Sequence, residues 1–351
     1  MGPALTCGPM TSQPRLRILI SETFDPWFNI ATEEWIFRDM DPNVQTLFLW
    51  RNSETVVIGR NQNPWTECNL KKMDDDKVKL ARRTSGGGAV YHDLGNTCFT
   101  FLSPRDGYDR SANSTIMLNA LKTFGIDAEA SGRNDLIVQD PDGPKKFSGS
   151  AFRETRDRAF HHGTVLMSVD LTKLAQYLTP HPKKMQSKGR SSVRARVINL
   201  NELNPLISHE TLVPALVKSF CEFYGSTAVP EVLNPENLEK APGLKQKVAD
   251  FASWDWRFGH APQFQEQLNE YLSWGFVDVF LDVEHSHISR VEIYSDSLFP
   301  QLIEVLQSSL VGVAHSKAGV DTAVAKATGA LPNLSSEIAE FGSWMKSQVE
   351  I

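Results

Sequence analysis

Short apolar segments of strand type alternate with segments of helical periodicity along most of this chain. This alternation favours strands and helices packed in layers, so we expect an α/β fold of mixed α+β character. Strands are predicted at residues 16–20, 46–50, 55–59, 97–102, 135–138, 146–151 and 162–169, and helices at 26–40, 113–124, 171–178 and 210–224.

Turn chemistry predicts how some of these segments are connected. Residues 46–50 and 55–59 flank the polar sequence Arg51-Asn52-Ser53-Glu54 and are expected to form a hairpin. A second hairpin is expected where a Pro-Asp-Gly turn at 141–143 separates 135–138 from 146–151. Asp25 and Asn29 are possible caps of the helix at 26–40.

The length of 351 residues indicates two domains, since one domain usually spans about 100–200 residues. A region rich in proline, glycine and tryptophan, 225–265, suggests a boundary near 258–264. We therefore predict a disordered tail at 1–14, a first domain at 15–258 and a small α/β accessory domain at 264–351. In the accessory domain, strands are expected at 277–283 and 288–294 and a helix at 300–310.

Composition excludes several classes of protein. The net charge of −6 argues against general binding to nucleic acid, which requires a basic face. The chain has no run of about 18 apolar residues that would span a membrane, and residues 1–15 lack the pattern of a targeting signal. Cysteines without paired spacing indicate free thiols and a cytoplasmic location; they are Cys7, Cys68, Cys98 and Cys221.

The sharpest motif runs from Arg82 to His92 and contains the consecutive glycines Gly86, Gly87 and Gly88. Consecutive glycines cost backbone entropy, and one reason to keep them is close approach of the backbone to a ligand, with N–H groups around an anion. Arg82 and Arg83 add donors suited to phosphate or carboxylate. The alternative is a flexible surface turn beside solvated arginines.

Lys146 precedes the small residues of the sequence Phe147-Ser148-Gly149-Ser150-Ala151. A lysine that opens a strand and is followed by small side chains can direct its ammonium into the space that they leave. There it would neutralise a reacting carboxylate and the phosphate it attacks. Most lysines are simply solvated, and Lys145 is the neighbouring alternative.

Six basic residues gather between Lys183 and Arg196 in an otherwise acidic chain, among them Lys188 and Arg194. A basic loop of this kind can close over a nucleotide and exclude water from a reactive intermediate. A solvated basic face is an equally good interpretation of the pattern.

Several further polar residues have two possible roles. Asp135 could hold Mg²⁺ together with substrate phosphates, or it could belong to a turn. His161 and His162 lack further ligands at metal spacing, so pocket lining or a core position is expected. Cys98 lies in an apolar strand and is expected to be a core residue rather than a nucleophile.

Seven ordered blocks of this sequence resemble the lipoate–protein ligase A family, within the biotin/lipoate A/B protein ligase superfamily. The similarity covers about residues 16–260, and the accessory unit fits the long, two-domain form. The blocks are Asp25–Asn29, Val56–Arg60 with Asn63–Trp65, Arg82–Asn96, Ala130–Asp135, Lys146–Ala151, His161–Thr164 and Ser192–Arg194.

The resemblance implies a biotin/lipoate-ligase-like catalytic domain with mixed sheets and packed helices. It implies that the carboxylate of lipoate attacks the α-phosphorus of ATP, with Mg²⁺ as activator, to give lipoyl-AMP and pyrophosphate. A lysine of an apo lipoyl domain, in an E2 subunit of a 2-oxo acid dehydrogenase or in the glycine-cleavage H protein, then takes the lipoyl group. No tightly bound cofactor is expected, and we expect a monomer.

The resemblance also assigns residues by matching position. Arg83, Gly88, Ala89, Val90, Tyr91 and Lys146 resemble the ATP-binding segment, and Gly86, Gly87, Gly88 and Lys146 resemble the lipoate-binding one. Lys146 is the expected catalytic residue. Lys188, Ser192 and Arg194 fall in the loop that covers the adenylate. The segment 1–14 departs from the family pattern.

Two alternatives stay open at the level of sequence. A lipoyltransferase that takes preformed lipoyl-AMP would share these loop motifs. An octanoyltransferase would use a cysteine nucleophile, for which Cys98 is poorly placed, or a carrier-protein acyl donor. A non-catalytic module that binds adenylates would bind nucleotide without modifying a lipoyl domain. Lipoate-dependent release of pyrophosphate from ATP distinguishes the ligase from both.

Overall fold

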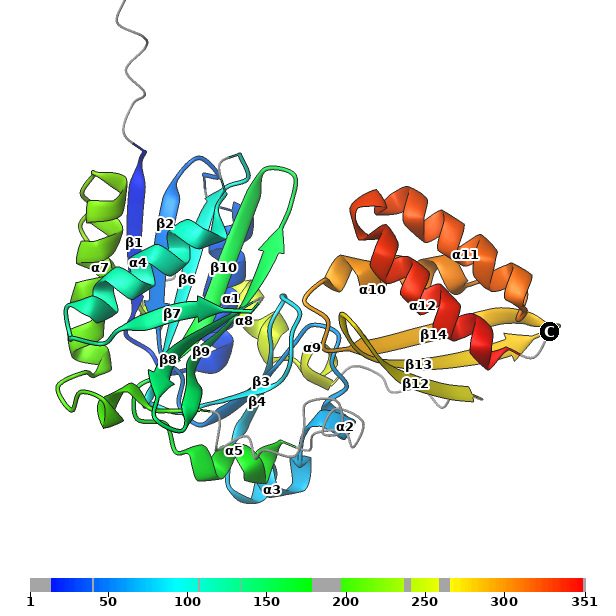
Figure 1. The fold of residues 1–351 in the computed structure, drawn as a ribbon, viewed down its shortest axis with the longest axis horizontal. Helices are drawn as coiled ribbons and strands as arrows, with labels where there is room; N and C mark the ends of the chain where they lie inside the picture. The colour runs from blue at the N-terminus through cyan, green and yellow to red at the C-terminus, as the bar shows by residue number, and fades with distance from the viewer. Residues whose placement is uncertain are drawn as a thin grey trace, which may run out of the picture.

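The computed structural model of the chain describes residues 14–39, 41–106, 108–132, 134–178, 197–236, 241–258 and 266–349. These residues form three β-sheets that pack with helices (Figure 1). This arrangement confirms the predicted mixed α/β class.

The largest sheet has eight strands and forms the centre of the N-terminal domain. β1 pairs in parallel with β2 and β11, and the strands from β2 to β7 pair antiparallel, so the sheet is mixed. Its order is β11 (Glu231–Leu233), β1 (Leu16–Ser21), β2 (Gln45–Trp50), β6 (Asn96–Pro104), β10 (Arg158–Leu166), β9 (Gly143–Glu154), β8 (Asp135–Asp140) and β7 (Ala128–Ser131).

Helices cover both faces of this sheet. On one face, α4 (Arg110–Lys122) and α7 (His209–Tyr224) pack against apolar side chains that include Phe99 and Phe101. On the other face, α1 (Pro26–Asp39) and α8 (Leu244–Ala252) pack against Phe48 and Phe160. Because successive side chains of a strand point to opposite faces, neighbours such as His161 and His162 face different helices.

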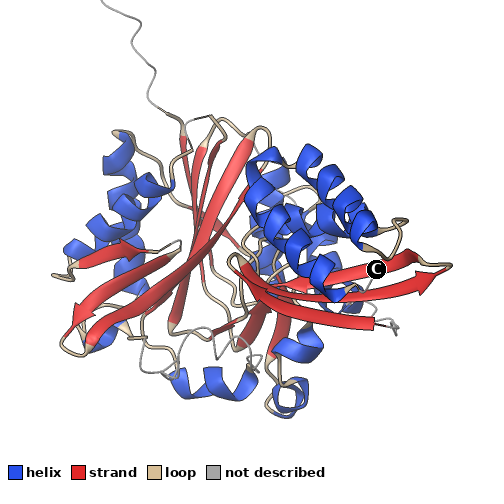
Figure 2. Cartoon of the chain, turned by 45° about the vertical axis from the view of Figure 1, so that its right-hand side comes forward, coloured by secondary structure: helices blue, strands red, loops and turns tan. Residues whose placement is uncertain are grey.

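A second, three-stranded sheet lies beside the first (Figure 2). Its order is β4 (Lys79–Arg82), β3 (Thr55–Ile58) and β5 (Val90–His92). Short helices lie near it, namely α2 (Pro64–Glu67), α3 (Leu70–Asp75), α5 (Leu171–Tyr177) and α9 (Trp254–Phe258), and the 3-10 turn η2 (Leu200–Glu202) follows later in the chain.

The predicted hairpin between residues 46–50 and 55–59 is wrong, because β2 and β3 belong to different sheets. Within the polar turn between them, Asn52 is buried and has no exposed surface. Asn29 donates to Asn52 Oδ1 at 3.0 Å, and Asn52 contacts His92 Nδ1 at 3.2 Å. These contacts direct the chain from one sheet into the other.

Asp25 and Asn29, both possible caps of the first helix, have different roles. Asp25 accepts the backbone N–H groups of Trp27 and Phe28 at 2.9 Å each, so the predicted cap at Asp25 is confirmed. The predicted cap at Asn29 is wrong, because its side chain is buried within α1 and bonds to neighbouring loops.

The second predicted hairpin is confirmed, since β8 and β9 pair antiparallel with Asp140 opposite Gly143. β9 is longer than predicted and places Lys146 inside the strand rather than at its start. The strand predicted at 162–169 begins earlier, at Arg158.

The C-terminal domain is a three-stranded sheet covered by helices (Figures 1 and 2). The two predicted strands and the predicted helix are present, and the described residues add a further strand and two further α-helices. The elements are β12 (Glu266–Leu272), β13 (Gly275–Glu284), β14 (His287–Ser295), α10 (Pro300–Leu310), α11 (Lys317–Ala330), η4 (Pro332–Leu334) and α12 (Ser335–Gln348). The predicted boundary at 258–264 falls largely outside the described residues and stays a prediction.

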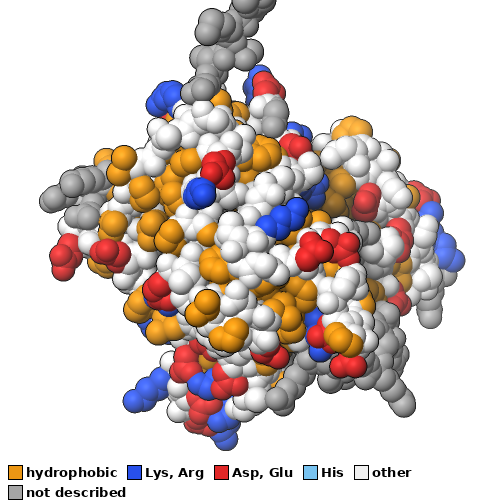
Figure 3. Space-filling view, turned by 60° about the vertical axis from the view of Figure 1, so that its left-hand side comes forward, with side chains coloured by type: hydrophobic (Ala, Val, Ile, Leu, Met, Phe, Trp, Pro, Cys, Tyr) orange, Lys and Arg blue, Asp and Glu red, His pale blue; other side chains and the backbone are white. Residues whose placement is uncertain are grey.

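The described part of the chain contains no helix that is both long and apolar enough to cross a membrane. Cys68, Cys98 and Cys221 are free thiols, as predicted, and Cys7 lies outside the described residues. On the face drawn in Figure 3, acidic and basic side chains are interspersed, in agreement with the modest net charge of −6.

Candidate active site

Lys146 and Asp135 form an ion pair on neighbouring strands of the large sheet, with 2.6 Å between Lys146 Nζ and Asp135 Oδ1. Both side chains are about one-third exposed, at 37% and 34%. Lys145 is instead paired with Asp140 at 2.9 Å, and this contact raises the Lys145 pKa. The two neighbouring lysines therefore lie in separate ion pairs.

A β-bulge determines where Lys146 points. Ser148 is opposite Leu136, and Lys146 is opposite Ile137, so Phe147 is the extra residue of β9. A bulge re-aims a side chain by shifting the alternation of the strand. As a result Lys146 shares a face with Gly149, and a Cβ at Gly149 would lie 2.7 Å from Lys146 Nζ. The space that a small residue leaves for the lysine is therefore at Gly149.

Arg83 is the internal support of the glycine loop. Its side chain is 7% exposed, and its guanidinium donates to the carbonyls of Gly86 at 2.7 Å, Gly88 at 2.8 Å and Val57 at 3.2 Å. Burial lowers the Arg83 pKa to about 10, so the side chain keeps its charge at neutral pH. Most of the donors predicted to meet a phosphate therefore bind the protein's own backbone.

Arg82 has a similar structural role. Its guanidinium donates to the carbonyls of Gln62 at 2.7 Å, Arg60 at 2.8 Å and Trp256 at 2.9 Å. Burial lowers the Arg82 pKa to about 10. The arginine pair thus joins the loop to α9 and to the segment after β3.

The glycine loop lies over the strand that carries Lys146. A Cβ at Gly87 would be 3.9 Å from Ala151 Cβ, and Ala151 is on the same face of β9 as Gly149. Ala151 lies five positions after Lys146 in β9, which at about 3.3 Å per residue is a distance of roughly 16 Å along the strand. The structure therefore brings the two predicted site features to one face of one strand.

The C-terminal domain contacts this loop directly. Gly87 N donates to the carbonyl of Ser297 at 2.8 Å, and a Cβ at Gly86 would lie only 2.1 Å from the same oxygen. Gly86 and Gly87 are buried, whereas Gly88 is exposed with nothing within 4 Å of its Cβ position. Gly86 is thus required by contact with the C-terminal domain, which no sequence signal indicated, and Gly87 by its positive φ of 92°.

The segment after the loop has mixed exposure. Ala89 and Val90 are partly exposed, but Tyr91 is 2% exposed, and its ring packs on Tyr177 at 5.6 Å between centroids. Burial raises the Tyr91 pKa. The predicted nucleotide contact at Tyr91 would therefore use its backbone rather than its phenol.

The predicted covering residues Lys188, Ser192 and Arg194 lie outside the described residues. The two ends of that segment are described. Leu178 forms a bridge with Cys68, and Val197 forms one with Lys146. The carbonyl of Lys146 also accepts from Ile198 N at 3.0 Å. The chain therefore returns from this segment directly beside the proposed catalytic lysine.

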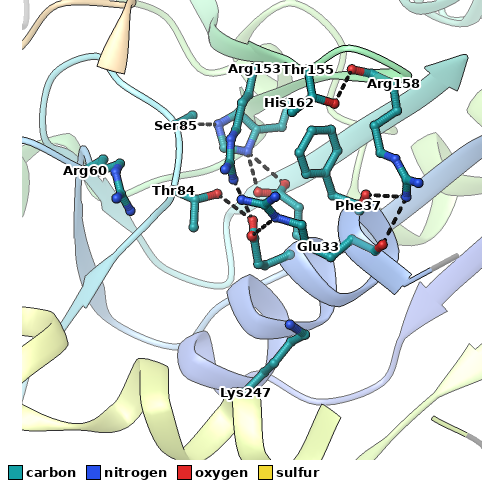
Figure 4. A network of polar contacts seen from close by, with 12 residues as sticks. Glu33, Phe37, Arg60, Thr84, Ser85, Arg153, Thr155, Arg158, His162 and Lys247 are labelled. Carbon is teal, nitrogen blue, oxygen red and sulfur yellow. Dashed lines mark hydrogen bonds and ion pairs between the residues drawn. The ribbon is translucent and has the colours of Figure 1, made fainter. Parts of the chain in front are cut away.

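Buried polar residues behind the loop were not identified from the sequence as site residues. His162 lies between Glu33 of α1 and Ser85, the residue before Gly86 (Figure 4). Glu34 contacts Thr84 and Arg153. Adjacent glutamates between apolar residues in the middle of a helix were the signal that could have found this network.

The expected core residues are in the core, and one cavity lies behind the site. Cys98 is 1% exposed, and burial raises its pKa well above the usual range for a thiol, so it is no nucleophile. His161 lines a cavity of about 150 Å³ on the α4 side, together with Asp135 and Ser148. No group of three or more metal-ligating side chains is present among the described residues.

Comparison with known proteins shows the family of this chain. A family model described as Lipoyl protein ligase A/B catalytic domain matches residues 25–221, and one described as Bacterial lipoate protein ligase C-terminus matches 261–345. Lipoate-protein ligase A of Bdellovibrio bacteriovorus is 53% identical over 337 residues, which cover 96% of this chain and 99% of that protein.

Two solved structures are also similar. LipL1 of P. falciparum, in complex with lipoate, is 35% identical with a TM-score of 0.81 and covers 95% of this chain and 99% of its own. A bi-partite lipoate protein ligase of Thermoplasma acidophilum, described with its E2 lipoyl domain, is 27% identical with a TM-score of 0.62, covering 72% and 99%. The chain therefore belongs to the lipoate–protein ligase A family.

Proposed function

We propose that this protein is an ATP-dependent ligase that activates lipoate as lipoyl-AMP and transfers the lipoyl group to a lysine of apo lipoyl domains. The observation that carries the proposal is the position of Lys146, on the same strand face as the glycine loop and beside the return of the segment 179–196. The names of the relatives support the choice of lipoate as substrate.

In the first step, a carboxylate oxygen of lipoate forms a bond to the α-phosphorus of ATP. The bond from that phosphorus to the bridging oxygen breaks, and pyrophosphate leaves with the electron pair. The attacking carboxylate and the phosphate are both anionic, so the Lys146 ammonium lowers the barrier by neutralising them as they meet. We assign ATP contacts to Gly88, Ala89, Val90 and Tyr91, through backbone groups, and to Lys146.

In the second step, the neutral amine of the acceptor lysine attacks the lipoyl carbonyl carbon. The bond from this carbon to the phosphate oxygen breaks, AMP leaves, and the amine loses a proton to solvent. Activation must come first because a carboxylate is a poor electrophile and a free lysine, with a pKa of about 10.4, is mostly protonated. We assign the exclusion of water to the segment that contains Lys188, Ser192 and Arg194.

Mg²⁺ would be held by Asp135 together with phosphate oxygens of ATP. A lone carboxylate suits this ion, which usually keeps several waters and takes few protein ligands. Asp135 lies 2.6 Å from the Lys146 ammonium, so cation and lysine would share its charge. When bound, the metal would supply charge neutralisation on the phosphates.

The acceptors we propose are E2 subunits of 2-oxo acid dehydrogenases and the glycine-cleavage H protein. The Thermoplasma acidophilum relative, described with an E2 lipoyl domain, supports the first class. Free thiols at Cys68, Cys98 and Cys221 support a cytoplasmic location, where thiols stay reduced. We propose that the enzyme acts as a monomer, which a measurement of mass in solution checks.

The deciding experiment incubates the purified protein with lipoate, ATP, Mg²⁺ and an apo lipoyl domain. The ligase releases pyrophosphate only when lipoate is present and increases the mass of the acceptor by one lipoyl group. A lipoyltransferase would release no pyrophosphate from lipoate and ATP, although it would modify the acceptor from supplied lipoyl-AMP. An adenylate-binding module would do neither, and absence of lipoate-dependent pyrophosphate release would refute the proposal.

A further inference from the structure

Helix α1 directs two adjacent carboxylates at the start of the glycine loop. Glu33 is 1% exposed and Glu34 is 8% exposed, although glutamate is rarely buried unless it has partners. Their partners outside α1 come from the turn after β4, from β6, from β9 and from β10 (Figure 4).

Glu33 is connected to the loop through a histidine, by a series of hydrogen bonds that we call the Glu33 arm. Glu33 Oε1 lies 2.8 Å from His162 Nδ1, and His162 Nε2 lies 2.7 Å from Ser85 Oγ. Ser85 has no exposed surface and immediately precedes Gly86. Thr100 completes the arm by donating to Glu33 Oε1 at 2.6 Å.

Glu34 bonds directly to Thr84, the residue before Ser85, and its contacts form the Glu34 arm. Thr84 Oγ1 donates to Glu34 Oε2 at 3.0 Å, and Arg153 Nη1 donates to the same oxygen at 2.8 Å. Arg38 Nε donates to the other carboxylate oxygen at 2.8 Å. Glu34 therefore ties the residue before Ser85 to the strand that carries Lys146.

The order Glu33, His162, Ser85 is that of a catalytic triad, but its surroundings exclude attack by the serine. Ser85 Oγ also accepts a hydrogen bond from Arg83 Nε at 3.1 Å. A nucleophilic oxygen has to reach a substrate carbonyl, and Ser85 is fully enclosed. The network is suited to holding the chain in place.

We propose that Glu33 and Glu34 are positioning residues that hold Thr84 and Ser85, and so set the path of Gly86–Gly88 before substrate binds. This inference rests on the proposed function, in which the glycine loop contacts lipoate and nucleotide. Pre-organisation of the loop removes an ordering cost from binding. Loss of the hydrogen bonds from Glu33 or Glu34 should therefore change KM more than kcat.

The experiment uses changes of nearly constant shape in the full-length protein. Thr84→Val removes the hydroxyl that Glu34 holds, and Thr84→Ser keeps it. His162→Asn breaks the Glu33 arm. His161→Asn is the matched control, since His161 is equally buried at 7% on the same strand but faces α4. Circular dichroism and thermal melting establish that each variant is folded.

Two readouts are compared with those of the wild type. Thr84→Val and His162→Asn are expected to speed hydrogen–deuterium exchange in the peptide 84–90 and to raise the KM for lipoate about tenfold, with little change in kcat. Thr84→Ser and His161→Asn are expected to leave both readouts near wild-type values.

The outcomes separate this inference from the proposed function. Unchanged exchange in peptide 84–90, or a fall in kcat at constant KM, overturns the positioning role while the wild type still ligates lipoate. Failure of Thr84→Ser to restore the wild-type KM also overturns it. Absence of lipoate-dependent pyrophosphate release in the wild type overturns the proposed function. The hydrogen–deuterium exchange measurements still test whether Glu33 and Glu34 hold the loop in that case.

Discussion

Lys146 and Gly149 face the same side of β9, although they are three positions apart, a spacing that places two side chains of a regular strand on opposite faces. The extra residue Phe147 in the bulge is the reason, because it shifts the alternation by one position. Without it, the ammonium would point to the α4 face, away from the glycine loop. The proposed chemistry therefore depends on one irregularity in strand pairing.

Replacing Lys146 with alanine should reduce lipoyl-AMP formation sharply in a folded protein. Loss of a charged contact costs about 1.5–3 kcal/mol, which corresponds to roughly ten- to more than a hundredfold in rate. Lipoate-dependent pyrophosphate release measures the effect. Lys145→Ala is the matched control, since its ion pair with Asp140 is separate from that of Lys146, and it should behave like the wild type. Equal activity of both variants would remove Lys146 from the mechanism.

Replacing Gly86 with alanine should loosen the contact between the C-terminal domain and the loop. The new Cβ would lie 2.1 Å from the Ser297 carbonyl oxygen, so the backbone has to shift and the bond from Gly87 N to that oxygen should break. Faster hydrogen–deuterium exchange in a peptide that contains Ser297 is the expected signal. Gly88→Ala, with nothing within 4 Å, should leave exchange there unchanged. Identical exchange in the two variants would contradict the prediction.

Replacing Arg83 with lysine should be nearly as harmful as replacing it with alanine. A single ammonium cannot donate at once to the carbonyls of Val57, Gly86 and Gly88, as the guanidinium does. We expect adenylation to fall at least about tenfold in both variants, and supplied lipoyl-AMP to restore part of the transfer. Full activity of the lysine variant would show that charge alone suffices. Failure of the rescue in a folded variant would assign Arg83 to the second step.

Acid should destabilise the protein through buried histidines. Burial lowers the pKa of both His92 and His161 to about 3, against an ordinary value of about 6.5. Between these values the unfolded chain binds protons that the folded one does not, so stability is lost as pH falls from 6.5 toward 3. Each histidine should cost about 2 kcal/mol between pH 7 and pH 5.

The test is urea unfolding of His161→Asn at pH 7 and pH 5. The difference in free energy of unfolding between the two pH values should be smaller than in the wild type by about 2 kcal/mol. His285→Asn is the control, since His285 is exposed at the tip between β13 and β14. An unchanged pH dependence in His161→Asn would mean that His161 is already charged in the folded protein.

Local patterns were sufficient for much of the fold. Asp25 before Pro26 marked the start of α1, and the Pro-Asp-Gly turn marked the hairpin of β8 and β9. The hairpin predicted across Asn52 failed because pairing between strands depends on distant partners. The buried contacts of Asn52 with Asn29 and His92 are invisible in a short window of sequence.

The sequence by itself determined the mixed α/β class, since apolar periodicities are local properties, and its ordered motif blocks indicated the family and the candidate site residues. Only the tertiary structure decided what those residues contact. Arg83 faces its own loop, Gly86 faces the C-terminal domain, and Glu33 reaches Ser85 through His162. These relationships join segments far apart in the chain, and burial rather than local pattern selects them, because a buried polar group must find a partner wherever the fold supplies one.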